Sequence, residues 1–267
     1  MLTLKQIVCM KVAPKVDQIK FDQEKKTIIR EGVENEINEA DKNALEAALH
    51  IKDVHGGTVT VLSMGPPSFE PYLKLAIAMG ADDAILLSDR SFAAADTFAT
   101  SRVLAQGIKK IGGFDIVFCG EASSDGSTEQ VPSSIAEWLQ IPQVTYANNV
   151  VKIENSKITA KRVVTGGYEV VETSLPVLVS VELGCNTPRF PDFRRKRWAE
   201  KEFKLTVWNM QDLQLSPSEV GVQGSCTVVK ETKSLPTPAR RGEFVSGSAQ
   251  EIARKLALVI KEAAAAS

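Results

Sequence analysis

The chain has 267 residues, 43% of them hydrophobic and 24% charged, with a formal net charge of −1. This is enough apolar sequence for a substantial core, and the balanced charge gives no electrostatic footprint for nucleic acid. No apolar run approaches the ~20 residues that cross a bilayer, and the first residues lack the features of a secretory signal. We therefore expect a cytoplasmic protein without direct membrane insertion.

The first half of the chain alternates strand-like apolar runs with amphipathic helical segments. Strands are expected at residues 7–12, 58–63, 83–88 and 114–119, and helices begin after Asn38, near Phe69, after Asp96 and at Pro132. Residues 19–35 form a hairpin-like excursion that we expect to act as a flap. Such alternation favours an α/β fold, an open and mostly parallel sheet with helices on both faces.

The pattern changes after residue 141. Four period-two runs, at 143–146, 158–164, 168–173 and 176–181, with turns at 155–156 and 166–167, predict an antiparallel extension of the sheet. Residues 206–241 have little periodicity, and a final helix is expected from about Ser248 to Ala265. These features predict an α/β domain at 1–205 and, at 206–267, an arm and helix that dock on another subunit.

The loop from Gly120 to Gln130 is the strongest candidate for a binding site. It joins a buried strand to a helix start, where backbone N–H groups lack helical partners and favour a phosphate. An ordinary turn at Asp125–Gly126, with Ser127 or Thr128 as a helix cap, remains an open alternative.

Several other loops should reach the same edge. The loops at Lys11, Met64, Asp89 and Gly120 all follow strands, and open α/β sheets bind ligands beyond the carboxyl ends of their strands. The chain has neither GxGxxG after its first strand nor a P-loop motif. A bound nucleotide would therefore be held by several loops together.

Other chemistry has little support in the sequence. The four cysteines, Cys9, Cys119, Cys185 and Cys226, lack metal-binding spacing, and buried free thiols are the favoured interpretation. His50 at a helix end and His55 in the following loop stand apart from any catalytic constellation. We therefore predict neither catalytic residues nor a metal site.

A basic and aromatic stretch follows Pro188. It suits either a solvated helix face or a protein–protein contact. The charged and aromatic residues are Arg189, Phe190, Phe193, Arg194, Arg195, Lys196, Arg197, Trp198, Lys201 and Lys204.

Taken together, several stretches resemble a known family. They are residues 9–12, 37–48, 64–67 with 75–82, Asp125–Val131 and Asn186–Phe190. With this order and spacing, the chain resembles, along essentially its whole length, the β subunit of electron transfer flavoproteins. The resemblance implies an adenine-nucleotide-hydrolase-like α/β fold and a heterodimer whose α subunit holds an electron-carrying FAD.

The resemblance also implies a nucleotide in the β subunit, AMP in ordinary members and a second FAD in the electron-bifurcating branch, where NADH donates a hydride. The segment from Asp89 to Ser101 is similar to that branch, whereas Glu121 and its neighbours depart from it. We expect FAD, with AMP as the alternative. The implied cofactor-binding residues are Cys9, Met10, Lys11, Asn38, Ser63, Met64, Asp89, Arg90, Thr97, Thr100, Gly120, Ser123, Ser124, Asp125, Gly126, Ser127, Thr128, Gln130 and Val131.

The resemblance further implies docking of partner flavin dehydrogenases after the Pro–Arg–aromatic motif, through Arg189, Phe190, Phe193, Arg194 and Arg195. The chain would then be a non-catalytic electron carrier subunit, or part of a bifurcating complex. A stand-alone adenine-nucleotide-binding regulatory domain is the alternative from another class.

Overall fold

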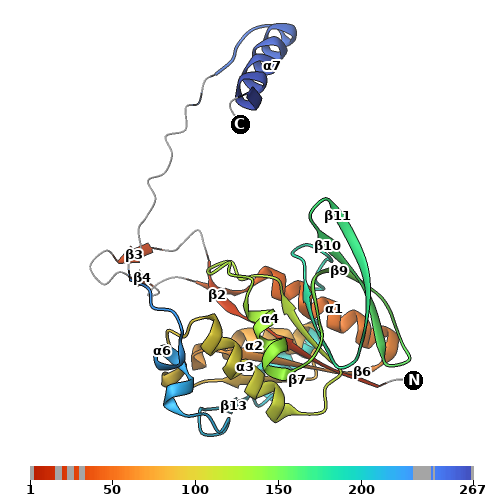
Figure 1. Ribbon diagram of the computed structural model, residues 1–267, viewed down its shortest axis with the longest axis vertical. Coiled ribbons are helices and arrows are strands. Elements are labelled where there is room, and N and C mark those ends of the chain that lie inside the picture. The colour runs from red at the N-terminus through yellow and green to blue at the C-terminus, as the bar shows by residue number, and fades with distance from the viewer. Residues whose placement is uncertain are drawn as a thin grey trace. The chain divides into compact units, whose positions relative to one another are not determined.

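The computed structural model describes residues 3–15, 20–22, 27–29, 34–230, 242 and 244–265. The chain divides into two compact units, Met1–Glu231 and Thr232–Ser267. The second unit holds the expected final helix, α7 (Ala249–Ala265), at whose start Ser248 exchanges hydrogen bonds with Glu251. The first unit is the α/β domain (Figure 1).

A nine-stranded sheet organises the first unit, in the order β11-β10-β9-β12-β8-β1-β6-β7-β13. Its strands are β1 (Leu4–Cys9), β6 (Gly57–Met64), β7 (Asp83–Leu87), β8 (Ile116–Gly120), β9 (Gln143–Glu154), β10 (Lys157–Val164), β11 (Gly167–Ser174), β12 (Val177–Val181) and β13 (Thr206–Trp208). The helices are α1 (Glu39–His55), α2 (Glu70–Met79), α3 (Thr97–Ile111), α4 (Val131–Leu139), α5 (Phe193–Lys201) and α6 (Gly221–Gly224).

The strand directions confirm the expected fold class. β1 pairs in parallel with β6 and β8, β7 pairs in parallel with β6 and β13, and β12 pairs in parallel with β8 and β9. Among the described strands of this sheet, the antiparallel pairs are β9–β10 and β10–β11, so the predicted extension is confirmed for these three strands. It was wrong for the fourth run, at 176–181, because the fully buried β12 lies between β8 and β9 and is parallel to both. Two small antiparallel pairs, β2 (Val12–Pro14) with β5 (Asn35–Ile37) and β3 (Lys20–Asp22) with β4 (Thr27–Ile29), follow β1.

Helices cover both faces of the sheet because its central strands are apolar on both sides. Val8 packs in one cluster with α1, α2 and Ala199 of α5, whereas Ile7 and Cys9 pack in the other with α3 and α4. The chain builds β6 and β7 on one side of β1 and β8 and β12 on the other. The direction of winding therefore reverses between β1 and β8.

Two predicted boundaries near the start were wrong. The first strand ends at Cys9 rather than at residue 12, because the Lys11 backbone turns aside: its carbonyl accepts from Asn38 N at 3.0 Å, and its N–H donates to Asp41 at 2.8 Å. His55, expected in a loop, is the last residue of α1. The excursion does contain the β3–β4 hairpin, although most of the proposed flap lies outside the described residues.

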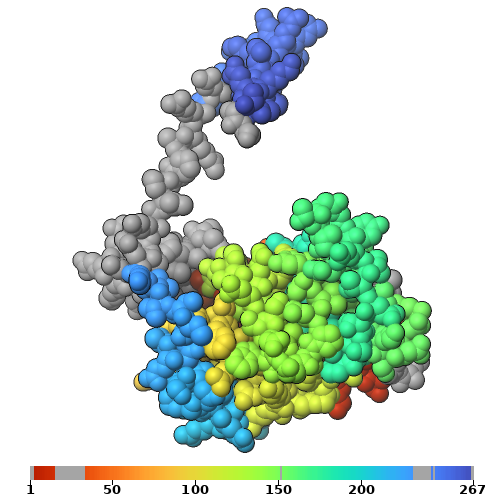
Figure 2. Space-filling model, in the orientation of Figure 1, coloured from red at the N-terminus to blue at the C-terminus, as the bar shows by residue number. Residues whose placement is uncertain are grey.

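Residues 206–231, which the sequence analysis assigned to the arm, fall within the first compact unit. β13 adds to the edge of the sheet beside β7, and the segment after it stays with the first unit through Glu231. Its hydrophobic side chains Leu213, Leu215 and Val220 are buried against the α3 face. Figure 2 shows this segment, in blue, lying against the body of the domain.

Candidate functional site

The candidate site lies where the winding of the sheet reverses. The parallel strands β8, β1, β6 and β7 end at Gly120, Cys9, Met64 and Leu87, so the loops that follow them leave from one edge. This is the edge at which open α/β sheets bind ligands. The structure therefore gathers the loops that the sequence singled out.

Lys11 joins the loop after β1 to the loop after β8. Its Nζ donates to Ser123 Oγ at 3.1 Å and to Asp125 Oδ1 at 2.5 Å. Burial by itself would raise the pKa of Asp125, but the hydrogen bond and charge of Lys11 hold that pKa below its usual range. The loop thus carries an ammonium group at its mouth.

The loop after β8 leaves backbone donors without acceptors. Gly126 N and Ser127 N both donate to Ser123 O, and Ser127 and Glu129 adopt positive φ angles of 45° and 58°. Within the described part of the chain, no acceptor contacts the N–H groups of Thr128, Glu129 or Gln130. They lie just before α4, which begins at Val131 with Gln130 as its cap residue, so the alternative interpretation of Ser127 or Thr128 as the helix cap is wrong.

Asp41 is a residue of this site that the sequence interpretation missed. It is buried, and its carboxylate accepts from Lys11 N and from Gly120 N, each at 2.8 Å. Burial raises its pKa to about 6 against the hydrogen bonds that lower it. The available signal was an acidic residue on the same helical face as the apolar Leu45.

Asn38 is not the side-chain helix cap that the sequence suggested. It precedes α1, but its side chain makes no capping hydrogen bond. Instead its Nδ2 donates to Ala122 O at 2.8 Å, and its Oδ1 accepts from Ser124 N at 3.1 Å. The amide is therefore committed to shaping the loop.

Comparison with known proteins supports the resemblance. The model of the electron transfer flavoprotein domain matches residues 25–210. The chain is 43% identical over 250 residues to the electron transfer flavoprotein subunit beta of Thermoanaerobacterium thermosaccharolyticum, covering 94% of this chain and 95% of that protein. The chain belongs to the electron transfer flavoprotein β-subunit family. It therefore belongs among electron transfer subunits.

Two further relatives carry more specific names. Subunit CarD of the caffeyl-CoA reductase–Etf complex of Acetobacterium woodii is 43% identical over 259 residues, with 96% of this chain and 97% of CarD covered. Protein FixA of Azotobacter vinelandii is 40% identical over 249 residues, covering 90% of this chain and 87% of FixA.

In this β subunit a side-chain hydrogen bond joins the segment after β7 to the loop after β8. Thr97 Oγ1 donates to Gln130 Oε1 at 2.9 Å, and the side chain of Arg90 is exposed. Asp89 is committed elsewhere, accepting from Ser91 and from Met210 N, and the Ser91 N–H is the largest reason that its pKa is lowered. Asp89 therefore holds the chain after β13, and Thr97 reaches the loop.

The remaining predicted residues are mostly enclosed. Cys9, Met10 and Ser63 are buried, whereas Met64 and Thr100 are half-buried. Ser63 Oγ is buried and has no hydrogen-bond partner among the described residues. An unsatisfied hydroxyl at the end of β6 marks a place where a ligand atom or water would be stabilised.

Glu121, which the sequence places at the start of the loop after β8, is partly buried and bonds to another loop. Its Oε1 accepts from Leu183 N at 3.1 Å, beside the end of β12. Burial, followed by the neighbouring Glu182 and Glu129, raises its pKa. Its carboxylate is thus directed to the backbone of a neighbouring loop.

The predicted docking segment divides into two kinds of residue. Arg189 pairs with Glu46 and Asp53, and Arg195 donates to the carbonyls of Ile77 and Ala81. These two arginines therefore fasten the segment to α1 and α2. In contrast, Phe190 and Phe193 are 93% and 80% exposed, and Arg194 is also exposed.

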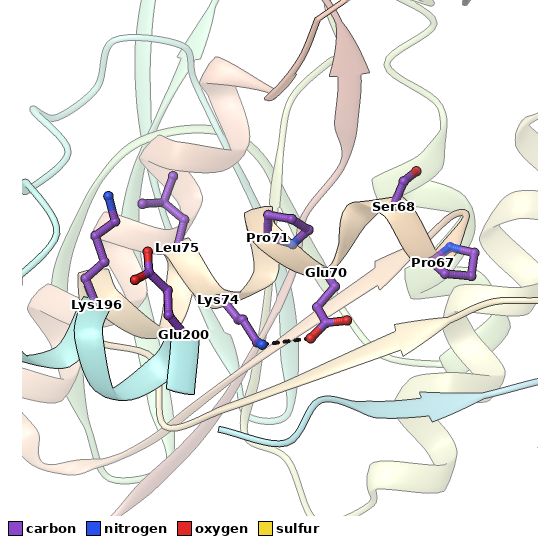
Figure 3. A pocket seen from close by; sticks show the side chains of 8 residues that line it. All are labelled: Pro67, Ser68, Glu70, Pro71, Lys74, Leu75, Lys196 and Glu200. Carbon is purple, nitrogen blue, oxygen red and sulfur yellow. Dashed lines mark ion pairs between the residues drawn. The ribbon is translucent and has the colours of Figure 1, made fainter. Parts of the chain in front are cut away.

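A pocket of about 600 Å³ lies between the start of α2 and α5. Figure 3 shows the Lys74–Glu70 ion pair on one side of it and Lys196 and Glu200 of α5 on the other. None of its lining residues is a predicted cofactor-binding residue, so this pocket does not contribute to the candidate site.

The described residues offer neither a metal site nor a membrane-spanning helix. No group of three or more histidine, cysteine, aspartate or glutamate side chains is placed to hold a metal ion. Among the helices that the structure describes, none is both long and apolar enough to cross a membrane.

Proposed function

We propose that this β subunit binds an adenine nucleotide at the site between Lys11 and the loop after β8, with FAD favoured and AMP as the alternative. The observation that carries the proposal is the run of N–H groups at Thr128–Gln130 that lack acceptors among the described residues. Such groups before a helix bind phosphate, and the Lys11 ammonium, paired with Asp125, adds a hydrogen-bond donor at the same loop. The site residues fit the phosphate portion common to both ligands.

Two observations favour the longer ligand. Thr97 contacts Gln130, and Arg90 is exposed in the same segment, which supports a binding surface that extends beyond the phosphate loop. The carboxylate of Glu121 accepts a hydrogen bond from Leu183 N, and the pKa of Glu121 is raised. Both effects reduce the electrostatic repulsion between Glu121 and a pyrophosphate. When bound, FAD supplies a group that accepts and releases electrons.

The proposed setting is a heterodimer with an electron transfer flavoprotein α subunit in the cytoplasm. Helix α7 has apolar side chains exposed at Leu256, Val259 and Ile260, which suits docking on that subunit. Phe190 and Phe193 would contact a partner flavin dehydrogenase. The similarity to CarD, a subunit of a reductase–Etf complex, supports a multisubunit assembly in which electron bifurcation from NADH is one proposed reaction.

The test is the nucleotide content of the purified heterodimer with its cognate α subunit. Denaturation should release two FAD and no AMP per heterodimer if the β site holds a flavin. One FAD and one AMP would identify a conventional carrier. Release of no nucleotide beyond the α-subunit FAD would refute the proposed site.

A pair of variants tests the place of binding. Lys11→Met should raise the dissociation constant of the β-site nucleotide by about tenfold, because one charge-assisted hydrogen bond donor is lost. Lys109→Met is the matched control, since Lys109 lies exposed in the last turn of α3. Equal affinities for the two variants would refute the role of Lys11.

A further inference from the structure

The first turn of α1 contacts both loops of the proposed nucleotide site. Asp41 accepts the backbone N–H of Lys11 after β1 and that of Gly120 at the end of β8. Asn38 bonds to Ala122 and Ser124, farther along the second loop. Four side-chain hydrogen bonds from Asn38 and Asp41, at the start of α1, therefore connect segments that are more than a hundred residues apart in sequence.

This turn has little freedom to move. Asn38 and Asp41 are only 3% and 6% exposed, and the N–H groups of Asp41 and Lys42 donate to Asn38 O. A Cβ atom placed on Gly120 would lie 2.5 Å from Asp41 Oδ1. The helix and the end of β8 are thus in direct contact, with Gly120 allowing the close approach.

We propose that Asn38 and Asp41 are positioning residues that hold the two nucleotide-binding loops at a fixed separation, and that Asp41 does so in its ionised form. This inference rests on the proposed nucleotide site. A carboxylate offers both oxygens as acceptors to the N–H groups of Lys11 and Gly120, whereas a protonated carboxyl group presents a hydroxyl to one of them. Protonation therefore weakens one of the two connections.

The charged and titratable surroundings of Asp41 come from three elements. Lys11 lies beyond β1 and is itself paired with Asp125 of the second loop, while the Cys119 thiol of β8 and the amide of Asn38 also face the carboxyl group. Burial raises the pKa of Asp41 to about 6. Its ionisation therefore changes within the range in which binding can be measured.

The test compares Asp41→Asn with the unaltered chain, each assembled with its α subunit and stripped of β-site nucleotide. FAD and AMP are titrated separately between about pH 5 and pH 8. For each ligand, the readout is the dissociation constant of Asp41→Asn divided by that of the unaltered chain at the same pH. This ratio cancels the titration of the ligand's own phosphate. We expect a ratio of about five to ten at pH 8, for one lost hydrogen bond, falling towards one at pH 5.

Controls separate positioning from general stability. Glu39→Gln is a matched change in the same turn, where the side chain is exposed, and its ratio should stay near one at every pH. Asn38→Ala should weaken binding several-fold while keeping the pH dependence due to Asp41. This second variant also tests the proposal if Asp41→Asn does not fold.

Three results would overturn the inference: a ratio for Asp41→Asn that is independent of pH, a ratio that is largest at low pH, or unchanged affinity in Asn38→Ala. The failure of the proposed function is distinguishable, since the unaltered heterodimer would then bind neither FAD nor AMP at the β site.

Discussion

Replacing Gly120 by alanine should disrupt the junction between α1 and β8. The added Cβ would lie 2.5 Å from Asp41 Oδ1 and 2.7 Å from both the carbonyl carbon and the Cβ of Ala40. To reach ordinary contact, these atoms would have to separate by roughly 0.7–0.9 Å, which a close-packed interior resists. Two of the three atoms belong to Ala40 at the helix start, so rotation of a flexible side chain cannot relieve the overlap.

The expected cost follows from this displacement. Overpacking a buried site typically costs about 1–3 kcal/mol, and lengthening the 2.8 Å bond from Gly120 N to Asp41 removes about 1 kcal/mol more. The midpoint of thermal unfolding should then fall by about 2–4 °C for each kcal/mol in a domain of this size. Binding of the β-site nucleotide should weaken as well, because the loop after β8 is displaced.

The assay is urea and thermal unfolding of the full-length chain, with Gly167→Ala as the matched control. Gly167 is also in a strand, but no atom lies within 4 Å of a Cβ placed on it. Its replacement should be neutral or slightly stabilising. If Gly120→Ala unfolds at the same midpoint as Gly167→Ala, the close contact between α1 and β8 is not what the structure indicates.

Four more predictions address other parts of the chain. Arg189→Lys should destabilise the chain by about 1–2 kcal/mol, measured by urea unfolding, because lysine cannot reproduce the paired hydrogen bonds to Glu46. The loss should be smaller in a Glu46→Gln background, where the contact of Arg189 with Asp53 remains, and an equal loss in both backgrounds would exclude the Glu46 pair as its source. Phe193→Ala should leave the unfolding midpoint unchanged but weaken dehydrogenase docking by about 2 kcal/mol in a binding titration; Val207→Ala, at another exposed apolar site, is the control, and equal affinities would exclude Phe193 as an anchor. Because the pKa of Asp41 rises from 3.8 to about 6 on folding, the free energy of unfolding should fall by up to about 3 kcal/mol as pH rises through this window, and a slope unchanged in Asp41→Asn would exclude this source. Truncation before Ser248 should abolish copurification with the α subunit, and an undiminished heterodimer yield would argue against docking through α7.

The order of elements was predictable because it depends on local patterns. Apolar runs and helix signals such as Asp96, which accepts from Ala99 N as an N-cap, lie close together in sequence. The hairpin turn at Asn155–Ser156 was likewise visible, and both residues have positive φ.

Features that depend on distant contacts were not predictable. β13 has only three residues and no periodic signal, and it is a strand because β7 offers it an unpaired edge. The roles of Asn38 and Asp41 at the start of α1 depend on distant segments. The side-chain partners of Asn38, which are Ala122 and Ser124, lie more than eighty residues away in sequence. Nothing in the local sequence distinguishes Asn38 from an ordinary helix cap.

The basic segment shows the same limit in another way. Composition identified a run of arginines, but it could not separate those that contact a partner from those that hold the segment in place. Arg189 and Arg195 make their hydrogen bonds within the chain, whereas Arg194 between them and the flanking Phe193 are exposed. Only the three-dimensional structure makes that division.

The attachment of α5 to α2 has a consequence for the entropy of association. Asp192 N donates to Ala78 O, its carboxylate caps α5, and Arg195 bonds to the carbonyls of Ile77 and Ala81 at the end of α2. The exposed Phe193 is therefore carried on backbone that is already ordered before any partner arrives. Ordering a free loop costs about 1–2 kcal/mol per residue, and a surface fixed in advance avoids most of this cost. A partner that binds α5 would then meet a surface that needs little rearrangement, and its rate of association should depend on orientation and charge more than on folding of the segment.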